Sequence, residues 1–401
     1  MYSDLVQPGR AGRGLTKILS LALSGLLLIT AALPSFSAWQ DPLNSPAKLT
    51  QIAHQTLLLD VVRAERRLVA VGAHGHIIYS DDNGLSWTQG KVPVSSTLTA
   101  VYFASGDHGW AVGHDGIILA TTDGGANWTK QFDGYQANDA IVIGTKANLE
   151  RVEAIMAEVE ASDDSIAIEE AEIALESATF GYEDALYDQE SGSTKPFLDV
   201  WFYDAKRGYA LGAYGMLFET LDSGATWVDA SARLDNPDRL HLNSISMAGP
   251  ESLVIVGEMG TLLRSDDLGK TWQRLYAPYD GSLFGLVAAG QQEFLFGLRG
   301  NVYFSADSGA SWKAAETGNL QTLLGGAASD DQVVLVGNGG ALVMVDANGN
   351  GRTITLNGRK AAASVAIASD GSLILAGEAG ITRLTAQGDP LDQTISMAGD
   401  F

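Results

Sequence analysis

The stretch "GHDGIILATTDGGANW", residues 113–128, holds a Gly-x-x-Gly turn, an apolar run, a second glycine turn and a tryptophan. Its Gly-x-x-Gly turn recurs along the chain. The first glycines of the seven copies are Gly72, Gly113, Gly212, Gly257, Gly297, Gly337 and Gly377, at spacings of 41, 99, 45, 40, 40 and 40 residues. A period near 40 residues is typical of a repeat architecture. One gap, between the second and third copies, breaks this period.

Five copies continue into a second motif: an aspartate seven residues after the second glycine, then a glycine and a tryptophan two and five residues later. Its members are Asp82, Gly84 and Trp87; Asp123, Gly125 and Trp128; Asp222, Gly224 and Trp227; Asp267, Gly269 and Trp272; and Asp307, Gly309 and Trp312. The same positions hold Ala347, Gly349 and Arg352 in the sixth copy and Gln387, Asp389 and Asp392 in the seventh. The last two copies therefore keep the frame and lose the motif.

Each repeat unit is expected to form four short strands; in the second copy these are "LTAVYFAS", "GWAVG", "GIILATT" and "NWTKQF". The aspartate motif then lies in the turn between the third and fourth strands. Its carboxylate accepts backbone N–H bonds, its glycine supplies a left-handed conformation, and its tryptophan packs between neighbouring sheets. The sequence predicts an all-β, seven-bladed β-propeller in which these aspartates are structural rather than catalytic. The ring can close through the chain before Leu57, or through "DQTISM" near the end, either of which could complete the seventh blade.

The pattern Ser-x-Asp-x-Gly-x-x-Trp resembles the Asp-box, or BNR, repeat, and its seven-fold use is similar to the photosystem II stability/assembly factor family of cyanobacteria and chloroplasts. The resemblance covers about residues 55–397 apart from the long gap. It implies a WD40-like, non-catalytic scaffold without a cofactor, which binds a membrane-protein subunit during its assembly or stabilisation in photosynthesis. The family's contact surface is basic whereas this chain carries a net charge of −23. A periplasmic accessory subunit of a non-photosynthetic envelope transporter complex is therefore an alternative.

The long gap corresponds to an insertion, residues 136–196, whose composition is that of helices. The segment is rich in Ala, Glu and Ile, and it holds 15 acidic and 3 basic residues between Gln136 and Lys195. Apolar residues recur at about helical spacing on both sides of "SDDS", which reads as a turn and N-cap; they are Ile155, Met156, Val159, Ile166, Ile173, Leu175 and Phe180. We expect an acidic helical hairpin. It is either a solvated surface pair or a docking arm that presents an apolar seam to a partner.

In a four-stranded blade, the turn between strands two and three lies at the same end as the connection to the next blade. The insertion is such a connection, so we expect it to emerge at the Gly-x-x-Gly end. The most variable residues of the repeat lie in these turns, and we interpret them as a partner-binding face. They are His74, His114, Asp115, Tyr214, Glu258, Met259, Arg299, Asn338 and Glu378.

Composition limits the compartment and the partners. Arg10, Arg13 and Lys17 precede the apolar run "ILSLALSGLLLITAAL" and "PSFSA", which together are typical of a signal peptide over residues 1–37. We expect an exported, soluble protein, in the periplasm or a compartment like the thylakoid lumen, with blades one and two in residues 38–135 and blades three to seven in 197–401. The absence of cysteine excludes disulfides and thiolate metal sites, and the acidic balance disfavours nucleic acid.

Three chemistries compete with the scaffold interpretation. A sialidase-like glycosidase also uses Asp-boxes but needs converging arginines, whereas Arg63, Arg66 and Arg67 crowd one segment. "DANGNG" from Asp346 is similar to the start of a calcium loop, yet it coincides with the sixth hairpin turn. His74 and His76 could hold a metal only with a third ligand such as His114. We expect no enzyme activity and no metal.

Overall fold

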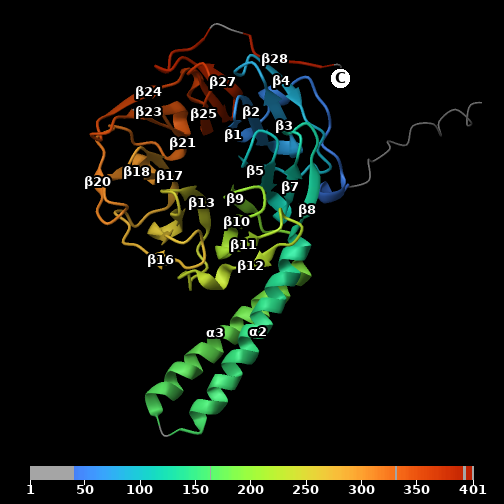
Figure 1. Cartoon of the computed structure of the whole chain (residues 1–401), viewed down its shortest axis with the longest axis vertical. Helices are drawn as coiled ribbons and strands as arrows, with labels where there is room; N and C mark the ends of the chain where they lie inside the picture. The colour runs from blue at the N-terminus through green and yellow to red at the C-terminus, as the bar shows by residue number, and fades with distance from the viewer. Residues whose placement is uncertain (1–39, 163, 330–331, 392–393, 400–401) are drawn as a thin grey trace, which may run out of the picture. The chain divides into compact units, whose positions relative to one another are not determined.

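A computed structural model describes residues 40–162, 164–329, 332–391 and 394–399. The segment for which a signal peptide is expected, residues 1–37, lies outside these described residues. Seven sheets follow one another along the described residues, and Figure 1 shows them as successive blades around one axis. The prediction of a seven-bladed β-propeller is confirmed.

Six blades contain four consecutive strands each, and the seventh contains three. The first three blades are β1 (Leu58–Ala64), β2 (Arg67–Gly72), β3 (Ile77–Ser80) and β4 (Ser86–Gln89); β5 (Leu98–Phe103), β6 (Gly109–Gly113), β7 (Ile118–Thr121) and β8 (Thr129–Phe132); and β9 (Phe197–Phe202), β10 (Gly208–Gly212), β11 (Leu217–Thr220) and β12 (Val228–Asp229). The next two are β13 (Leu242–Met247), β14 (Leu253–Gly257), β15 (Leu262–Ser265) and β16 (Gln273–Arg274); and β17 (Leu283–Ala289), β18 (Gln292–Gly297), β19 (Val302–Ser305) and β20 (Lys313–Ala314). The last two are β21 (Leu323–Ser329), β22 (Gln332–Gly337), β23 (Ala341–Val345) and β24 (Gly351–Thr355); and β25 (Ala362–Ile367), β26 (Leu373–Gly377) and β27 (Gly380–Leu384).

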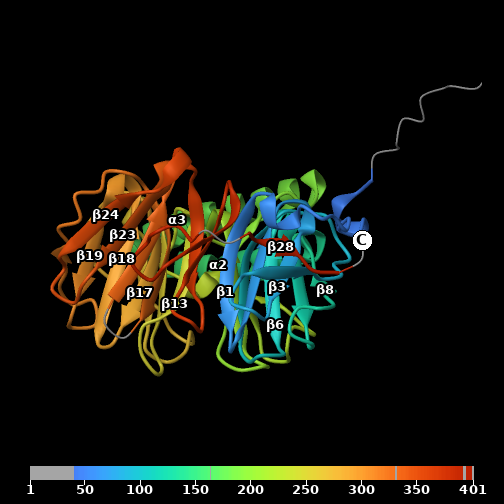
Figure 2. The ribbon, with the colours of Figure 1, turned by 90° about the horizontal axis from the view of Figure 1, so that it is seen from above.

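The second strand of each blade is buried almost along its whole length, because blades cover it on both faces. The sequences of such strands are continuously apolar and lack the alternation of apolar and polar residues that is typical of half-buried strands. The first strands contact each other in order round the ring, and β25 contacts β1. Figure 2 shows the blades edge-on, with β1, β3, β6 and β13 crossing the thickness of the ring.

The ring does not close as the sequence suggested. The strand β28 (Ser396–Met397), which comes from "DQTISM", pairs in parallel with β4 of the first blade and not with the seventh blade. The chain before Leu57 forms the short 3-10 turn η2 (Ala53–Gln55) beside β27 instead of a strand. Both expectations for completing the seventh blade were wrong. The pairing of β28 ties the last segment of the chain to the first blade.

The Asp-box turns are held by side-chain hydrogen bonds. Asp123 Oδ1 accepts bonds from Thr121 Oγ1 at 2.9 Å and Asn127 N at 2.9 Å, and Thr121 Oγ1 accepts from Gly125 N at 3.1 Å. Gly125 has a φ of +91°, the left-handed region that glycine adopts without strain, and its carbonyl accepts from Trp128 Nε1 at 2.9 Å. Trp128 packs against Val69 and other residues of the preceding blade. Each turn thus joins two blades.

The sixth copy keeps a related turn, shifted by one residue. The hairpin between β23 and β24 is closed by Asp346, whose Oδ1 accepts bonds from Asn348 N and Asn350 N at 2.8 and 2.9 Å. A hydrogen bond from the Asn350 side chain, together with these backbone bonds, holds the pKa of Asp346 below its usual value. The "DANGNG" segment is therefore a hairpin turn in the structure.

Replacing Asp267 with alanine is expected to lower the free energy of unfolding by about 1 kcal/mol, as for a lost helix N-cap. Hydrogen bonds from Thr271 lower the pKa of this carboxyl to about 2, so the acceptor is ionised at neutral pH. Urea denaturation measures the change. Asp280→Ala, at an exposed position outside the turns, is the control. Equal stability of the two variants would contradict the assigned role.

Two long helices, α2 (Gly134–Glu160) and α3 (Ser165–Ser191), form an antiparallel pair between the second and third blades. Asp133 caps α2 through a reciprocal bond pair with Gln136, and Asp164 of "SDDS" caps α3. The helical hairpin expected from composition is confirmed. Within the described part of the chain, no helix combines the length and apolar character needed to cross a bilayer.

Candidate partner-binding face

The seven Gly-x-x-Gly turns share one end of the propeller, and backbone packing explains their glycines. A Cβ on Gly113 would lie 2.2 Å from the carbonyl oxygen of Thr97, where the first strand of the blade begins. The first glycine of every copy meets the same obstacle, at 2.0 to 2.3 Å. The motif is therefore needed by the fold, whereas the two residues between its glycines are free to vary.

The second of these two residues adopts a left-handed conformation in six turns. It is a non-glycine residue in five of them: His74, Asp115, Tyr214, Met259 and Arg299, with φ between +49° and +61°. The sixth turn has Gly339 at this position. A non-glycine residue in this conformation costs about 1 kcal/mol or more, so five strained side chains are held at one end of the molecule. Four Asp-box turns, at the other end of the blades, also hold a non-glycine residue in this conformation (Asn83, Ser223, Leu268 and Ser308), so the strain belongs to the turns of the repeat and not to one face.

The structure places all nine predicted face residues at this end, but their surroundings differ. Met259, Tyr214 and Arg299 are exposed, as are His74, His114, Asn338 and Glu378. Asp115 instead accepts a hydrogen bond from Ser96 Oγ at 2.6 Å, and Glu258 accepts from His241 N at 3.1 Å. These two carboxylates stabilise their own turns through hydrogen bonds.

The histidines do not converge. The rings of His74 and His76 lie 5.8 Å apart, and His76 is buried beside Thr56, with its pKa lowered by burial. His114 belongs to the turn of the next blade. Across the described residues, no group of three His, Asp or Glu side chains is placed to bind a metal ion.

Sequence reasoning missed two large apolar residues near these turns. Tyr276 and Leu320 are 98% and 81% exposed. They lie in the connections that follow blades four and five, and these connections contact the turns of Met259 and Arg299. Single apolar residues in short polar connections carry no periodic signal, so the sequence pattern did not reveal them. Tyr214 and Met259 are exposed at the same end, on blades three and four.

The helical hairpin begins and ends beside the same face. Ser193 Oγ donates to the carbonyl oxygen of Asp115, and α2 contacts the turn η4 (His114–Gly116). The ammonium group of Lys195 lies 5.1 Å from the ring centroid of Tyr214. A cavity of about 610 Å³ separates the hairpin from the third blade, with Tyr214, Arg151 and Arg239 in its wall. The insertion begins and ends at the Gly-x-x-Gly end, as expected, but it extends outward from the rim of the ring and does not rise from that face (Figure 1).

Known proteins share the repeat and the fold of this chain. The family model described as "Photosynthesis system II assembly factor YCF48" matches residues 83–154 and 188–383. The chain belongs to this family. The match leaves out residues 155–187, which include nearly all of α3.

Curated relatives of the YCF48 family each match about 30% of the chain. The "Photosystem II assembly lipoprotein Ycf48" of Synechococcus sp. (strain CC9902) is 36% identical over 123 residues, 30% of this chain and 37% of that protein. The "Photosystem II stability/assembly factor HCF136, chloroplastic" of Oryza sativa subsp. japonica is 32% identical over 125 residues, 29% of this chain and 30% of that protein. The chain thus spans about a third of the length of these relatives.

Solved YCF48 structures share the fold. The structure described as "YCF48 bound to D1 peptide" has a TM-score of 0.56 at 16% identity and covers 86% of this chain and 98% of its own. "YCF48 from Cyanidioschyzon merolae" has a TM-score of 0.56 at 13% identity and also covers 86% of this chain and 98% of its own. The WD40 propeller domain of Doa1 follows at 0.54 and 11% identity, covering 86% of this chain and 96% of its own. At these identities the likeness concerns the propeller alone.

Two half-buried carboxylates lie on inner strands of this YCF48-family propeller. Asp60 accepts hydrogen bonds from Val101 N at 2.9 Å and Ser364 Oγ at 2.7 Å, which joins the first blade to the second and the seventh. Asp199 accepts from Ile245 N at 2.9 Å, which joins blades three and four. Burial raises the pKa of both, that of Asp199 to about 7 with a further contribution from the charge of Asp60. Nothing in the repeat pattern marked these residues.

Proposed function

We propose that this chain is an exported, non-catalytic scaffold that binds a membrane-protein partner during its assembly or stabilisation. The binding surface is the Gly-x-x-Gly face with the nine residues named above, and the helical insertion, residues 136–196, is its docking arm. The observation that carries the proposal is the exposure of four large apolar residues at this end, Tyr214, Met259, Tyr276 and Leu320. Apolar side chains that are left exposed favour contact with a partner, because their burial in an interface is favourable.

Family membership supports a partner of this kind. Relatives are named photosystem II assembly factors, and one solved relative is described as bound to a D1 peptide. A propeller that holds a polypeptide segment at one end needs no catalytic group. The box aspartates fit this role, since hydrogen bonds within their own turns occupy their carboxylates.

The double substitution Met259→Asp and Leu320→Asp should reduce partner capture at least tenfold, because two carboxylates would enter an apolar contact. The measurement is co-purification of membrane proteins from the source organism with the tagged chain. Leu221→Asp is the matched control: Leu221 is 63% exposed and lies in an Asp-box turn at the opposite end of its blade. The identity of the captured protein distinguishes a photosystem subunit from a transporter. Equal capture by all three forms would contradict the proposed face.

A further inference from the structure

The helix α3 packs on α2 through its small residues. Ala171, Ala178, Gly181 and Ala185 are buried. Three of them recur at intervals of seven, as expected for the inner seam of a paired helix. Half-buried Ile168, Leu175 and Tyr182, also seven residues apart, share this seam, whereas the other large apolar residues of α3 lie elsewhere on the helix.

Four of these large residues form a stripe on the outer side of α3: Ile166, Ile173, Phe180 and Tyr187. They also recur every seven residues, and their exposed fractions range from 60% to 71%. At about 1.5 Å per residue the stripe is roughly 30 Å long. The outermost heptad position of a solvated helix pair is ordinarily polar, so the hairpin forgoes the free energy of burying four large side chains. A stripe of this period fits a second helix lying alongside α3.

Acidic side chains follow the stripe along its length. Glu169, Glu176, Glu183 and Glu190 each lie three residues after a stripe residue, and α3 as a whole has eight carboxylates and no lysine or arginine. Asp184 pairs with Arg239 at 3.4 Å and Asp188 pairs with Lys195. Among the described residues, the other six carboxylates of α3 form no salt bridge. The stripe thus has an acidic border that the molecule itself does not neutralise.

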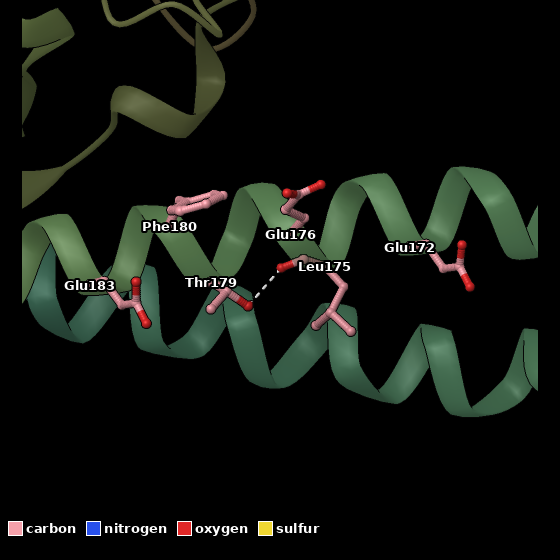
Figure 3. A pocket seen from close by; sticks show the side chains of 6 residues that line it. All are labelled: Glu172, Leu175, Glu176, Thr179, Phe180 and Glu183. Atoms are coloured by element: carbon pink, nitrogen blue, oxygen red, sulfur yellow. Dashed lines mark hydrogen bonds between the residues drawn. The ribbon is translucent and has the colours of Figure 1, made fainter.

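The grooves beside Phe180 combine both features. A groove of about 410 Å³ runs along α3 with Leu175, Thr179 and Phe180 in its wall, between Glu172, Glu176 and Glu183. Figure 3 shows Phe180 and Glu176 pointing to the same side of the helix. A second groove of about 440 Å³ lies on the other side of Phe180 and reaches Ile173 and Arg239. Phe180 is the ridge between them.

We propose that this stripe binds a basic amphipathic helix of the partner protein, with apolar residues at heptad spacing and lysines or arginines on both sides. A second copy of the chain would bring two acidic stripes together, and an anionic membrane surface would repel the glutamates. A cationic helix instead buries Phe180 and pairs the free carboxylates. The inference rests on the proposed scaffold function, and it assigns the chemistry of the partner at the docking arm.

A synthetic helical peptide of about three heptads, with leucines at heptad positions and flanking lysines, tests the inference. A second peptide carries glutamates in place of the lysines. We expect the full chain to bind the first peptide and not the second in fluorescence anisotropy, and added salt to weaken the binding. Phe180→Ala should raise the Kd about tenfold or more, and the Glu176→Gln, Glu183→Gln pair should reduce its salt dependence. Alanine and glutamine favour helix, so these variants keep α3 folded.

Ile143→Ala is the matched control, since Ile143 is 71% exposed on α2 and lies outside both grooves. Equal binding of the two peptides, no binding of either, or unchanged binding after Phe180→Ala would overturn the inference. A self-associated form, or attachment to vesicles of zwitterionic lipid, that Phe180→Ala abolishes would overturn it in favour of a second copy or a membrane. The Met259→Asp, Leu320→Asp variant should bind the peptide normally. Failure of the peptide assay with partner capture still sensitive to that variant would leave the scaffold function standing.

Discussion

Glu293→Ala is expected to destabilise the propeller by about 3 to 5 kcal/mol, the cost of leaving a buried charge without its partner. Glu293 on β18 and Arg264 on β15 are 3% and 7% exposed, and Arg264 Nη1 lies 2.8 Å from Glu293 Oε1. The pair joins blades four and five. Without Glu293, the guanidinium group stays buried and keeps only its bond to the exposed Asp266. The free energy of unfolding in urea measures the loss.

The double variant Arg264→Met, Glu293→Leu is the control for this prediction. Removing both charges and filling the space with apolar atoms should restore most of the lost stability, because the desolvation cost disappears along with the pair. If the double variant were as unstable as Glu293→Ala, the loss would come from packing rather than from charge.

Asp199 should make the stability of the propeller fall as the pH rises from 5 to 8. The pKa of Asp199 is raised to about 7 in the folded chain, against an ordinary value of 3.8. Between these values the unfolded chain has released the proton while the folded chain retains it, so ionisation favours unfolding. The stabilisation that comes from the retained proton is complete below pH 3.8 and is lost as the pH rises through about 7. We expect a decrease of about 2 to 3 kcal/mol between pH 5 and pH 8.

The variant Asp199→Asn cannot titrate and should lose this part of the slope in urea denaturation series at several pH values. Asp267→Asn is the control, because the pKa of Asp267 is about 2 in the folded chain and the group stays ionised throughout the range. A slope that Asp199→Asn leaves unchanged would show that Asp199 does not hold its proton in the folded ring.

The repeat period predicted the fold because every turn and strand of the propeller is specified locally. The two glycines of each turn, the box aspartate and its tryptophan act within one blade or between neighbours, so spacing alone reveals them. Ring closure is different: β28 pairs with β4 across almost the whole chain, and two residues of strand carry no signal of their partner. Asp60 and Asp199 likewise form their bonds between blades, and only the assembled ring buries them.

The contact between the two helices of the hairpin was likewise not predictable from a local sequence pattern. Composition predicted two helices, and the cap at Asp164 was visible in "SDDS". The apolar residues Ile166, Ile173 and Phe180 suggested a seam, but a single helix pattern cannot say which face meets the second helix. In the structure that contact is formed by small residues together with half-buried Ile168, Leu175 and Tyr182, whereas Ile166, Ile173 and Phe180 lie outside it.

Photocrosslinking tests directly whether the Gly-x-x-Gly end of the propeller contacts the partner. A photoreactive amino acid is placed in turn at Met259 and at Leu221, two exposed positions at opposite ends of neighbouring blades. We expect a crosslink to one membrane protein from position 259 and at least tenfold less from position 221. Equal crosslinking from the two positions, or crosslinking from position 221 alone, would contradict it.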